Sequence, residues 1–92
     1  MSTWMYLECL DHDPPITSAD EVGQHLYDLP DIRRMVAERQ TIVRFAKEYG
    51  ALPEGYFAQN AMRFLRDHPK CRIRIVDEYD VEHPLIEGDT PA

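Results

Sequence analysis

The chain has 92 residues, about the length of one small domain, and its seventeen Asp and Glu against ten Lys and Arg give a formal net charge of −7. Apolar residues make up 43 % of the chain, which argues against a disordered acidic tail, and no apolar run reaches the roughly 18–20 residues of a membrane span. Two cysteines are too few for a disulfide scaffold, and the start, Met-Ser-Thr-Trp, lacks the layout of a signal peptide. We therefore expect a single domain over 1–92, with its core over 3–85, in a reducing cytoplasm without membrane contact.

The first predicted element is a β-strand from Thr3 to Leu10, where large side chains alternate in direction along the chain. Residues 11–15 end in two prolines and predict a stiff extended loop, because proline cannot donate a backbone hydrogen bond. The two faces of the strand are expected to carry Met5, Leu7 and Cys9 on one side and Trp4, Tyr6 and Glu8 on the other.

A first helix is predicted over 18–29, because Ser18 and Glu21 have the spacing of a capping box. Pro30 is expected to end this helix and to stand in the first turn of a second helix over 31–49, which Gly50 terminates. The buried side chains of the first helix are expected to be Val22, Leu26 and Leu29. Those of the second helix are expected to be Ile32, Met35, Val36, Ile42, Val43, Ala46 and Tyr49.

A third helix is predicted over 55–67, and Pro69 terminates it shortly after His68. Residues 71–77 alternate again and predict a second strand, while 81–85 predict a weak edge strand and 86–92 a flexible tail. The core side of the third helix is expected to carry Phe57, Ala61, Phe64 and Leu65.

These elements predict an α+β fold in the order β-α-α-α-β, with three helices packed on one face of a small antiparallel sheet. The two strands are expected to pair antiparallel, because this direction places Glu8 opposite Arg72 and Cys9 opposite Cys71. A parallel pairing loses the match of opposite charges. In the antiparallel pairing, the first and the last predicted strands lie side by side.

Four residues have the types and spacing of a zinc site. Cys9 and His12 have the spacing Cys-x2-His, and His68 and Cys71 have its mirror image, His-x2-Cys. Thiolate and imidazole are the preferred ligands of structural zinc, and the antiparallel pairing would bring the two halves together. Two alternatives remain open: the cysteines are inert core thiols beside one packed and one exposed histidine, or they form a Cys–Cys bond or another redox pair.

The open face of the sheet offers a candidate interaction surface. Trp4 and Tyr6 are large aromatic residues with little of the chain left to cover them, so they either bind a partner or a second copy of the chain, or lie under the C-terminal segment. Arg39 projects from the apolar side of the second predicted helix. It either extends its charged end to solvent or pairs with a carboxylate, or it makes a polar contact in a dimer or partner interface.

The charges are segregated along the chain. Residues 1–31 carry seven acidic side chains and no Lys or Arg, 32–74 carry all ten basic side chains with four acidic ones, and 75–92 carry six acidic side chains alone. We expect the acidic ends to fold over the basic middle. The acidic surface argues against direct nucleic-acid binding, although it permits recognition of a basic partner.

Several short stretches carry a resemblance to a known group of proteins. They are Tyr6-Leu7-Glu8-Cys9, His12-Asp13-Pro14-Pro15, Glu21-Val22-Gly23, Leu29-Pro30-Asp31-Ile32-Arg33, Asn60-Ala61-Met62-Arg63-Phe64 and His68-Pro69-Lys70-Cys71. Over roughly residues 4–80 the chain resembles small uncharacterised proteins of actinobacterial bacteriophages. The resemblance implies expression in the cytoplasm of an infected bacterial cell, and it implies no catalytic residues.

The function expected from the sequence is that of a non-enzymatic phage accessory protein, which contacts a host or phage protein and forms a homodimer. The alternatives are an acidic decoy of a nucleic-acid-binding host protein and a small zinc-stabilised module, with no other cofactor expected. An enzyme is the least supported class, because Cys71 and His68 have the spacing of a nucleophile and its base but lack an orienting third group and an oxyanion site.

Overall fold

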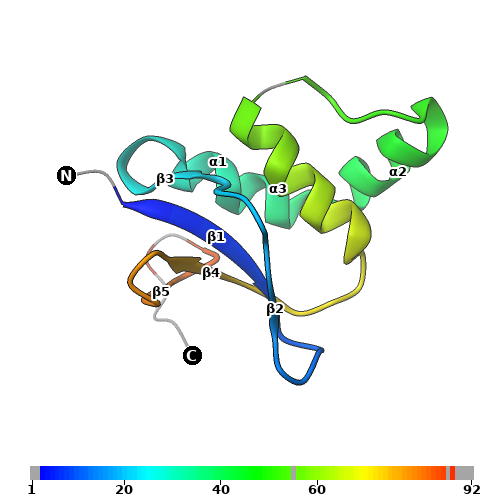
Figure 1. Cartoon of the computed structure of the whole chain (residues 1–92). Helices are drawn as coiled ribbons and strands as arrows, with labels where there is room; N and C mark the ends of the chain where they lie inside the picture. Colours follow the sequence, from blue (N-terminus) through cyan, green and yellow to red (C-terminus); the bar gives the residue numbers. More distant parts are fainter. Residues whose placement is uncertain (1–2, 55, 87, 89–92) are drawn as a thin grey trace.

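The structure is a computed structural model that describes residues 3–54, 56–86 and 88, without the side chains of Tyr56 and Phe57. Within these residues the chain has an α+β fold with three helices and a five-stranded antiparallel sheet, as Figure 1 shows. The predicted core position of Phe57 and most of the predicted tail, 86–92, lie outside the described residues.

The sheet is organised around strand β1 (Trp4–Cys9). One side of β1 pairs with β4 (Ile73–Asp77), which pairs in turn with β5 (Glu82–His83). The other side of β1 pairs with two very short strands, β2 (Ile16–Thr17) and β3 (Gly23–Gln24). The two short strands were not predicted, since two residues are too few to show an alternating pattern.

The predicted antiparallel pairing of β1 with β4 is confirmed, but its predicted register is wrong. Cys9 lies opposite Ile73 and Glu8 lies opposite Arg74, each two residues further along the chain than predicted. A shift of two residues keeps every side chain on the same face, so the hydrophobic pattern cannot distinguish the two registers. The observed register is favoured by the ion pair between Arg74 and Glu8.

The three helices are α1 (His25–Ala37), α2 (Arg39–Tyr49) and α3 (Tyr56–Asp67). The third helix agrees with the prediction to within one residue. The boundaries of the first two predictions are wrong, because residues 18–24 are not helical and the chain changes helix at Glu38 rather than at Pro30.

Competing hydrogen bonds explain why α1 begins late. The hydroxyl group of Ser18 accepts a hydrogen bond from the N–H group of Leu7, so this side chain serves the edge of β1 instead of capping a helix. The helix begins after Gln24, whose N–H group donates to the carboxylate of Asp28. Pro30 lies inside α1 on its exposed side. The backbone hydrogen bond that proline cannot donate is offset by the burial of Ile32 and Met35, which follow it in the same helix.

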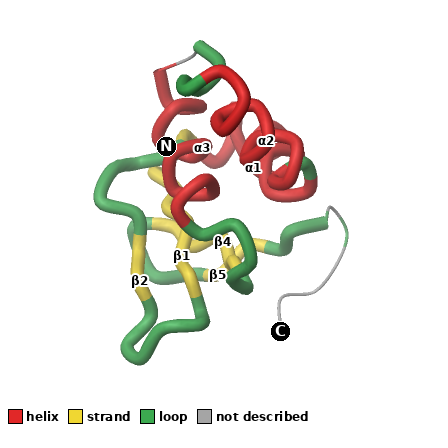
Figure 2. Tube along the Cα trace, turned by 90° about the vertical axis from the view of Figure 1, so that its right-hand side faces the viewer, coloured by secondary structure: helices red, strands yellow, loops and turns green. Residues whose placement is uncertain are grey.

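The core is a single cluster of buried side chains from β1, β4 and the helices, and Figures 1 and 2 show the helices grouped on one side of the sheet. Leu26 and Tyr49 were predicted to be buried, but they are 66 % and 65 % exposed. For Leu26 the reason is the late start of α1, which turns a different stripe toward the sheet. The central members of the cluster are Met5, Leu7, Cys9, Leu29, Ile32, Ala61, Phe64, Leu65, Ile73 and Ile75.

Candidate metal centre

The end of β1 and the segment before β4 bring three of the four predicted zinc ligands together. The sulfur atoms of Cys9 and Cys71 and a ring nitrogen of His12 all lie within 4.8 Å of one another. Cys9 is fully buried, Cys71 is half-buried and His12 is exposed, so the group lies at the surface with its thiols toward the core. Tetrahedral zinc needs thiolate sulfurs about 2.3 Å from the ion, hence about 3.8 Å from each other. An inward movement of at most about 1 Å therefore brings the sulfurs to this separation.

His68, the fourth predicted ligand, lies beside this group but not within it. Its ring centroid is 5.8 Å from that of His12, and the two rings are nearly perpendicular at 88°. Nδ1 lies 2.8 Å from the carbonyl oxygen of Phe64, which can only accept, so Nδ1 is the donor and Nε2 is left as the free ligand atom. This hydrogen bond to a backbone carbonyl is typical of histidines that bind metals.

The thiol of Cys9 affects the protonation of the Cys71 thiol. A hydrogen bond with Cys9, followed by partial burial, raises the pKa of the Cys71 thiol above its usual value. Without a metal ion the Cys71 thiol therefore carries its proton at neutral pH. A metal ion would have to displace this proton, as it does at every thiolate site.

Side chains of α2 hold the segment that carries His68 and Cys71. Nη1 of Arg39 donates to the carbonyl oxygens of both residues, at 3.2 Å and 2.6 Å. Nε2 of Gln40 donates to the carbonyl oxygen of Pro69 at 2.7 Å. The guanidinium group of Arg39, which was predicted to pair with a carboxylate or to contact a partner, thus binds backbone carbonyl groups beside the candidate centre.

Arg72 links this segment to the loop that carries His12. Asp11 accepts hydrogen bonds from the N–H group of Arg72 at 2.7 Å and from its Nε at 2.9 Å, and Leu10 donates to the carbonyl oxygen of Arg72. The backbone N–H group and then the guanidinium group of Arg72 hold the pKa of the Asp11 carboxyl below its usual range. The two halves of the candidate centre are therefore brought together by the protein itself.

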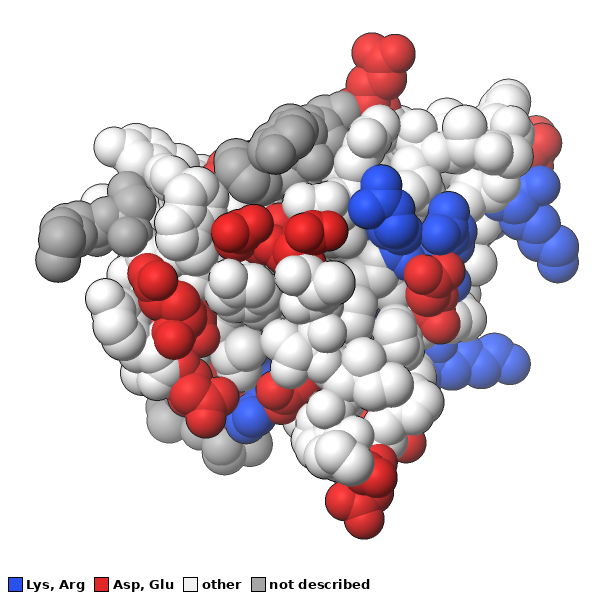
Figure 3. All heavy atoms as spheres, in the orientation of Figure 1, with Lys and Arg blue, Asp and Glu red and all other residues white. Residues whose placement is uncertain are grey.

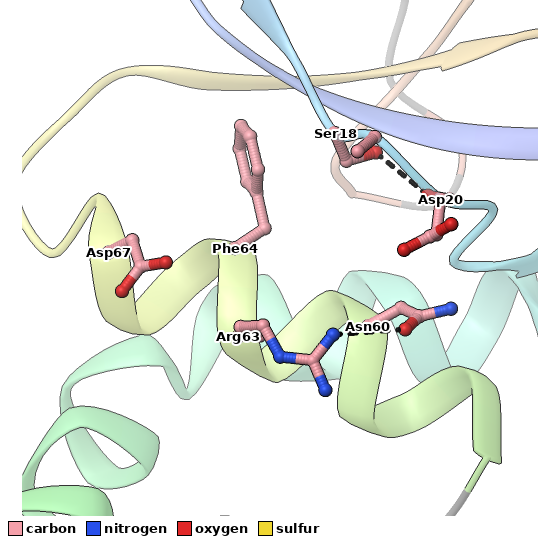
Figure 4. Close-up of a pocket in the computed structure, with 7 residues that line it drawn as sticks. Ser18, Asp20, Asn60, Arg63, Phe64 and Asp67 are labelled. Atoms are coloured by element: carbon pink, nitrogen blue, oxygen red, sulfur yellow. Dashed lines mark hydrogen bonds between the residues drawn. The ribbon is translucent and has the colours of Figure 1, made fainter.

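A small crevice lies between the chain at 18–20 and helix α3 (Figure 4). Its volume is about 170 Å³, below the roughly 300–1,000 Å³ of pockets for small organic ligands. The amide nitrogen of Asn60 donates to the carbonyl oxygen of Glu21 at 2.9 Å, which fastens α3 to this part of the chain. The crevice is lined by Ser18, Ala19, Asp20, Asn60, Arg63, Phe64 and Asp67.

A larger groove, of about 340 Å³, runs beside Tyr6 and the end of β4. Trp4 and Tyr6, the predicted partner-binding residues, are both half-buried. Burial and the nearby Glu21, Glu78 and Asp20 raise the pKa of Tyr6, so its phenol stays neutral. On the face shown in Figure 3, Lys and Arg gather toward α2 and α3, whereas most Asp and Glu lie over the strands and loops.

A second cluster, which was not predicted from the sequence, closes the turn between β4 and β5. One carboxylate oxygen of Asp77 lies 2.9 Å from Nε2 of His83, and the other accepts the N–H groups of Tyr79 and Val81. Burial alone would raise the pKa of Asp77, but these hydrogen bonds outweigh it and lower the pKa. The ring of His25 lies 4.8 Å from that of His83.

Comparison with known proteins found no match for the chain. No protein-family model, no curated protein and no solved structure matches the chain. No helix within residues 3–54, 56–86 and 88 combines the length and apolar character that a membrane crossing requires. A functional proposal therefore rests on the geometry of the candidate sites.

Proposed function

We propose that this chain is a small zinc-stabilised module in which Cys9, His12, His68 and Cys71 hold one Zn²⁺ ion. The observation that carries the proposal is the approach of three donor atoms, two sulfurs and one ring nitrogen, to within 4.8 Å of one another. The free Nε2 of His68 would complete four-coordinate binding, because imidazole rings that share a tetrahedral zinc ion have centroids about 5 Å apart. The ring centroids of His68 and His12 lie 5.8 Å apart in the structure.

The chemistry of the donors favours zinc over harder cations. Two thiolates and two imidazoles match structural Zn²⁺, whereas Mg²⁺ and Ca²⁺ prefer carboxylate and carbonyl oxygens. The carboxylate of Asp11, which precedes His12 in the sequence, is occupied by Arg72. The set therefore offers soft and borderline donors without a competing oxygen ligand from Asp11.

Four protein ligands suit a structural role rather than a catalytic one. A catalytic zinc ion keeps one position open for water or substrate, whereas a structural ion is closed by the protein. The ion would fasten the loop after β1 to the segment between α3 and β4, two parts of the sequence that only the fold brings together. Metal binding adds directly to the folding free energy, which matters most for a domain of this size.

The proposal is tested by the metal content of protein purified without added zinc and without an affinity tag that binds metal. We expect about one equivalent of zinc per chain, and its replacement by Co²⁺ should give the charge-transfer absorption of thiolate–cobalt bonds. Cys71→Ser and His12→Ala should lower the zinc content, whereas the matched variant His25→Ala should retain it. Zinc far below one equivalent in the wild-type protein, together with no thiolate–cobalt absorption, would refute the proposal.

The groove beside Tyr6 and the end of β4 supports a second candidate function, contact with a basic surface of a partner protein. Tyr6, Glu78 and Asp80 line this groove, and no Lys or Arg is among its described lining residues. We expect a lysine-rich peptide to bind better than a neutral peptide of equal length, and the difference to disappear at high salt. Equal binding of both peptides, or unchanged binding by the double variant Glu78→Gln and Asp80→Asn, would contradict this role.

A further inference from the structure

The two cysteines of the candidate centre differ in their access to solvent. Cys9 is fully buried at the end of β1, whereas Cys71 is half-buried in the segment before β4. Their sulfur atoms nevertheless lie within 4.8 Å of each other. An oxidant from solution can therefore reach the thiol of Cys71, while the buried thiol of Cys9 lies close to it.

We infer that a peroxide converts Cys9 and Cys71 into a disulfide and thereby releases the zinc ion from this centre. The inference rests on the proposed function, because it assigns a means of regulation to the same four residues. Its chemistry requires only the two thiolates of this chain and a peroxide as the oxidant.

The reaction proceeds in two balanced steps. The sulfur of Cys71 attacks one peroxide oxygen, the O–O bond breaks, and Cys71 becomes a sulfenic acid while the other oxygen leaves with a proton as water or alcohol. The sulfur of Cys9 then attacks the sulfur of Cys71, the S–S bond forms, and the sulfenic oxygen leaves with a proton as water. The two sulfurs together lose two electrons and the peroxide gains two. Two imidazoles remain as ligands, which is too few to keep the ion bound.

Strand pairing holds only one of the two cysteines. Cys9 pairs with Ile73 in the ladder between β1 and β4, but Cys71 lies outside that ladder and is not constrained by strand pairing. The sulfur atoms must approach from at most 4.8 Å to about 2.0 Å, which rotation of the Cys71 side chain and a small shift of its segment can supply. The sheet itself need not open.

The experiment treats the zinc-loaded wild-type protein with hydrogen peroxide in the presence of a chromogenic zinc chelator. We expect release of the bound zinc together with a mass 2 Da below that of the reduced chain, and dithiothreitol should restore both the mass and zinc binding. In Cys9→Ser the sulfenic acid of Cys71 should persist and be trapped by dimedone. In Cys71→Ser the buried Cys9 should give little dimedone adduct. Both variants are examined under conditions where circular dichroism shows them folded.

The two proposals fail in different ways. Absence of zinc from the reduced protein, measured before any oxidant is added, overturns the proposed function and this inference with it. Retention of zinc through peroxide treatment overturns only the inference. Release of zinc with gain of oxygen atoms at both sulfurs, or with disulfides only between two chains, overturns it as well.

Discussion

Arg39 at the start of α2 donates a 2.6 Å hydrogen bond to the carbonyl oxygen of Cys71, one of the proposed zinc ligands. The same guanidinium nitrogen also bonds the carbonyl oxygen of His68 at 3.2 Å. One side chain thus fixes the backbone of both ligands on this side of the centre. In the proposed zinc site it would position the ligands without touching the ion.

Substitution of Arg39 should therefore weaken zinc binding more than it weakens the fold. We expect Arg39→Met to lower zinc affinity by about 10- to 100-fold, the usual effect of removing a group that orients metal ligands. The unfolding free energy of the zinc-free protein should fall by only about 1–2 kcal/mol, since two carbonyl groups lose a donor. Competition with a chelator measures the affinity and urea unfolding measures the stability. If Arg39 had a purely structural role, the substitution would lower the unfolding free energy and leave the zinc affinity of the folded protein unchanged.

Removal of Arg74 should be costly because it leaves Glu8 buried without its cation. Arg74 bonds Glu8 at 2.6 Å and Glu82 at 3.3 Å, and the side chain of Glu8 is only 10 % exposed. We expect Arg74→Met to lower the unfolding free energy by about 2–3 kcal/mol, the low end for a broken buried pair because Arg74 itself is partly exposed. Urea unfolding checks this value.

The matched control for Arg74 is Arg34→Met, whose partner Asp31 is exposed. This variant should lose no more than about 0.5 kcal/mol. Addition of Glu8→Leu to Arg74→Met should recover part of the lost stability, because the unpaired charge is then gone. Equal losses in Arg34→Met and Arg74→Met would contradict the argument.

Asp77 should make the stability of the sheet depend on pH. Hydrogen bonds from His83, Val81 and Tyr79 outweigh the effect of burial and lower the pKa of this carboxyl in the folded state. A lowered pKa contributes stability above the unfolded-state value of about 3.9, and this stability is lost as the pH falls through the folded-state pKa. The urea midpoint of Asp77→Asn should therefore fall less than that of wild type between about pH 5 and pH 2. Asp80→Asn, an exposed change in the same turn, should behave as wild type does.

Gly23 should tolerate substitution far less well than Gly50. An alanine Cβ at Gly23 would lie 2.5 Å from Cβ of Asp28, and the φ angle of +153° is unfavourable for any side chain. We expect Gly23→Ala to cost about 3 kcal/mol, the sum of overpacking and backbone strain. Gly50→Ala has open space around the new methyl group and should cost about 1 kcal/mol through its φ angle of +68° alone. A calorimetric or urea titration showing equal losses would refute this ranking.

The sequence predicted those features that depend on local patterns. Alternation along 3–10 and 71–77 revealed β1 and β4, and Gly50 and Pro69 marked the ends of two helices. The predicted antiparallel pairing was enough to place Cys9, His12 and Cys71 close together. This part of the prediction held although the predicted register was wrong. A shift of two residues keeps both cysteines on the same face.

The rest depended on contacts between distant residues. Ser18 has the spacing of a helix cap, but its hydroxyl group serves Leu7, and nothing in the local sequence shows this. The bonds of Arg39 to backbone carbonyls were likewise hidden, because they join elements far apart in the sequence. The bond between Asp77 and His83 spans only six positions, but it depends on the turn that pairs β4 with β5. An arginine at an apolar position was the one signal that could have pointed to such a contact.

The pairing of β1 with β4 has a consequence for biosynthesis. Met5 faces Asp77, 72 positions later in the chain, so the central strand must wait for its main partner until most of the polypeptide has been made. During that interval one edge of β1 lacks the hydrogen-bonding partner that it has in the finished protein. We expect nascent chains truncated before residue 73 to engage chaperones and resist release, whereas chains extended through His83 should escape them.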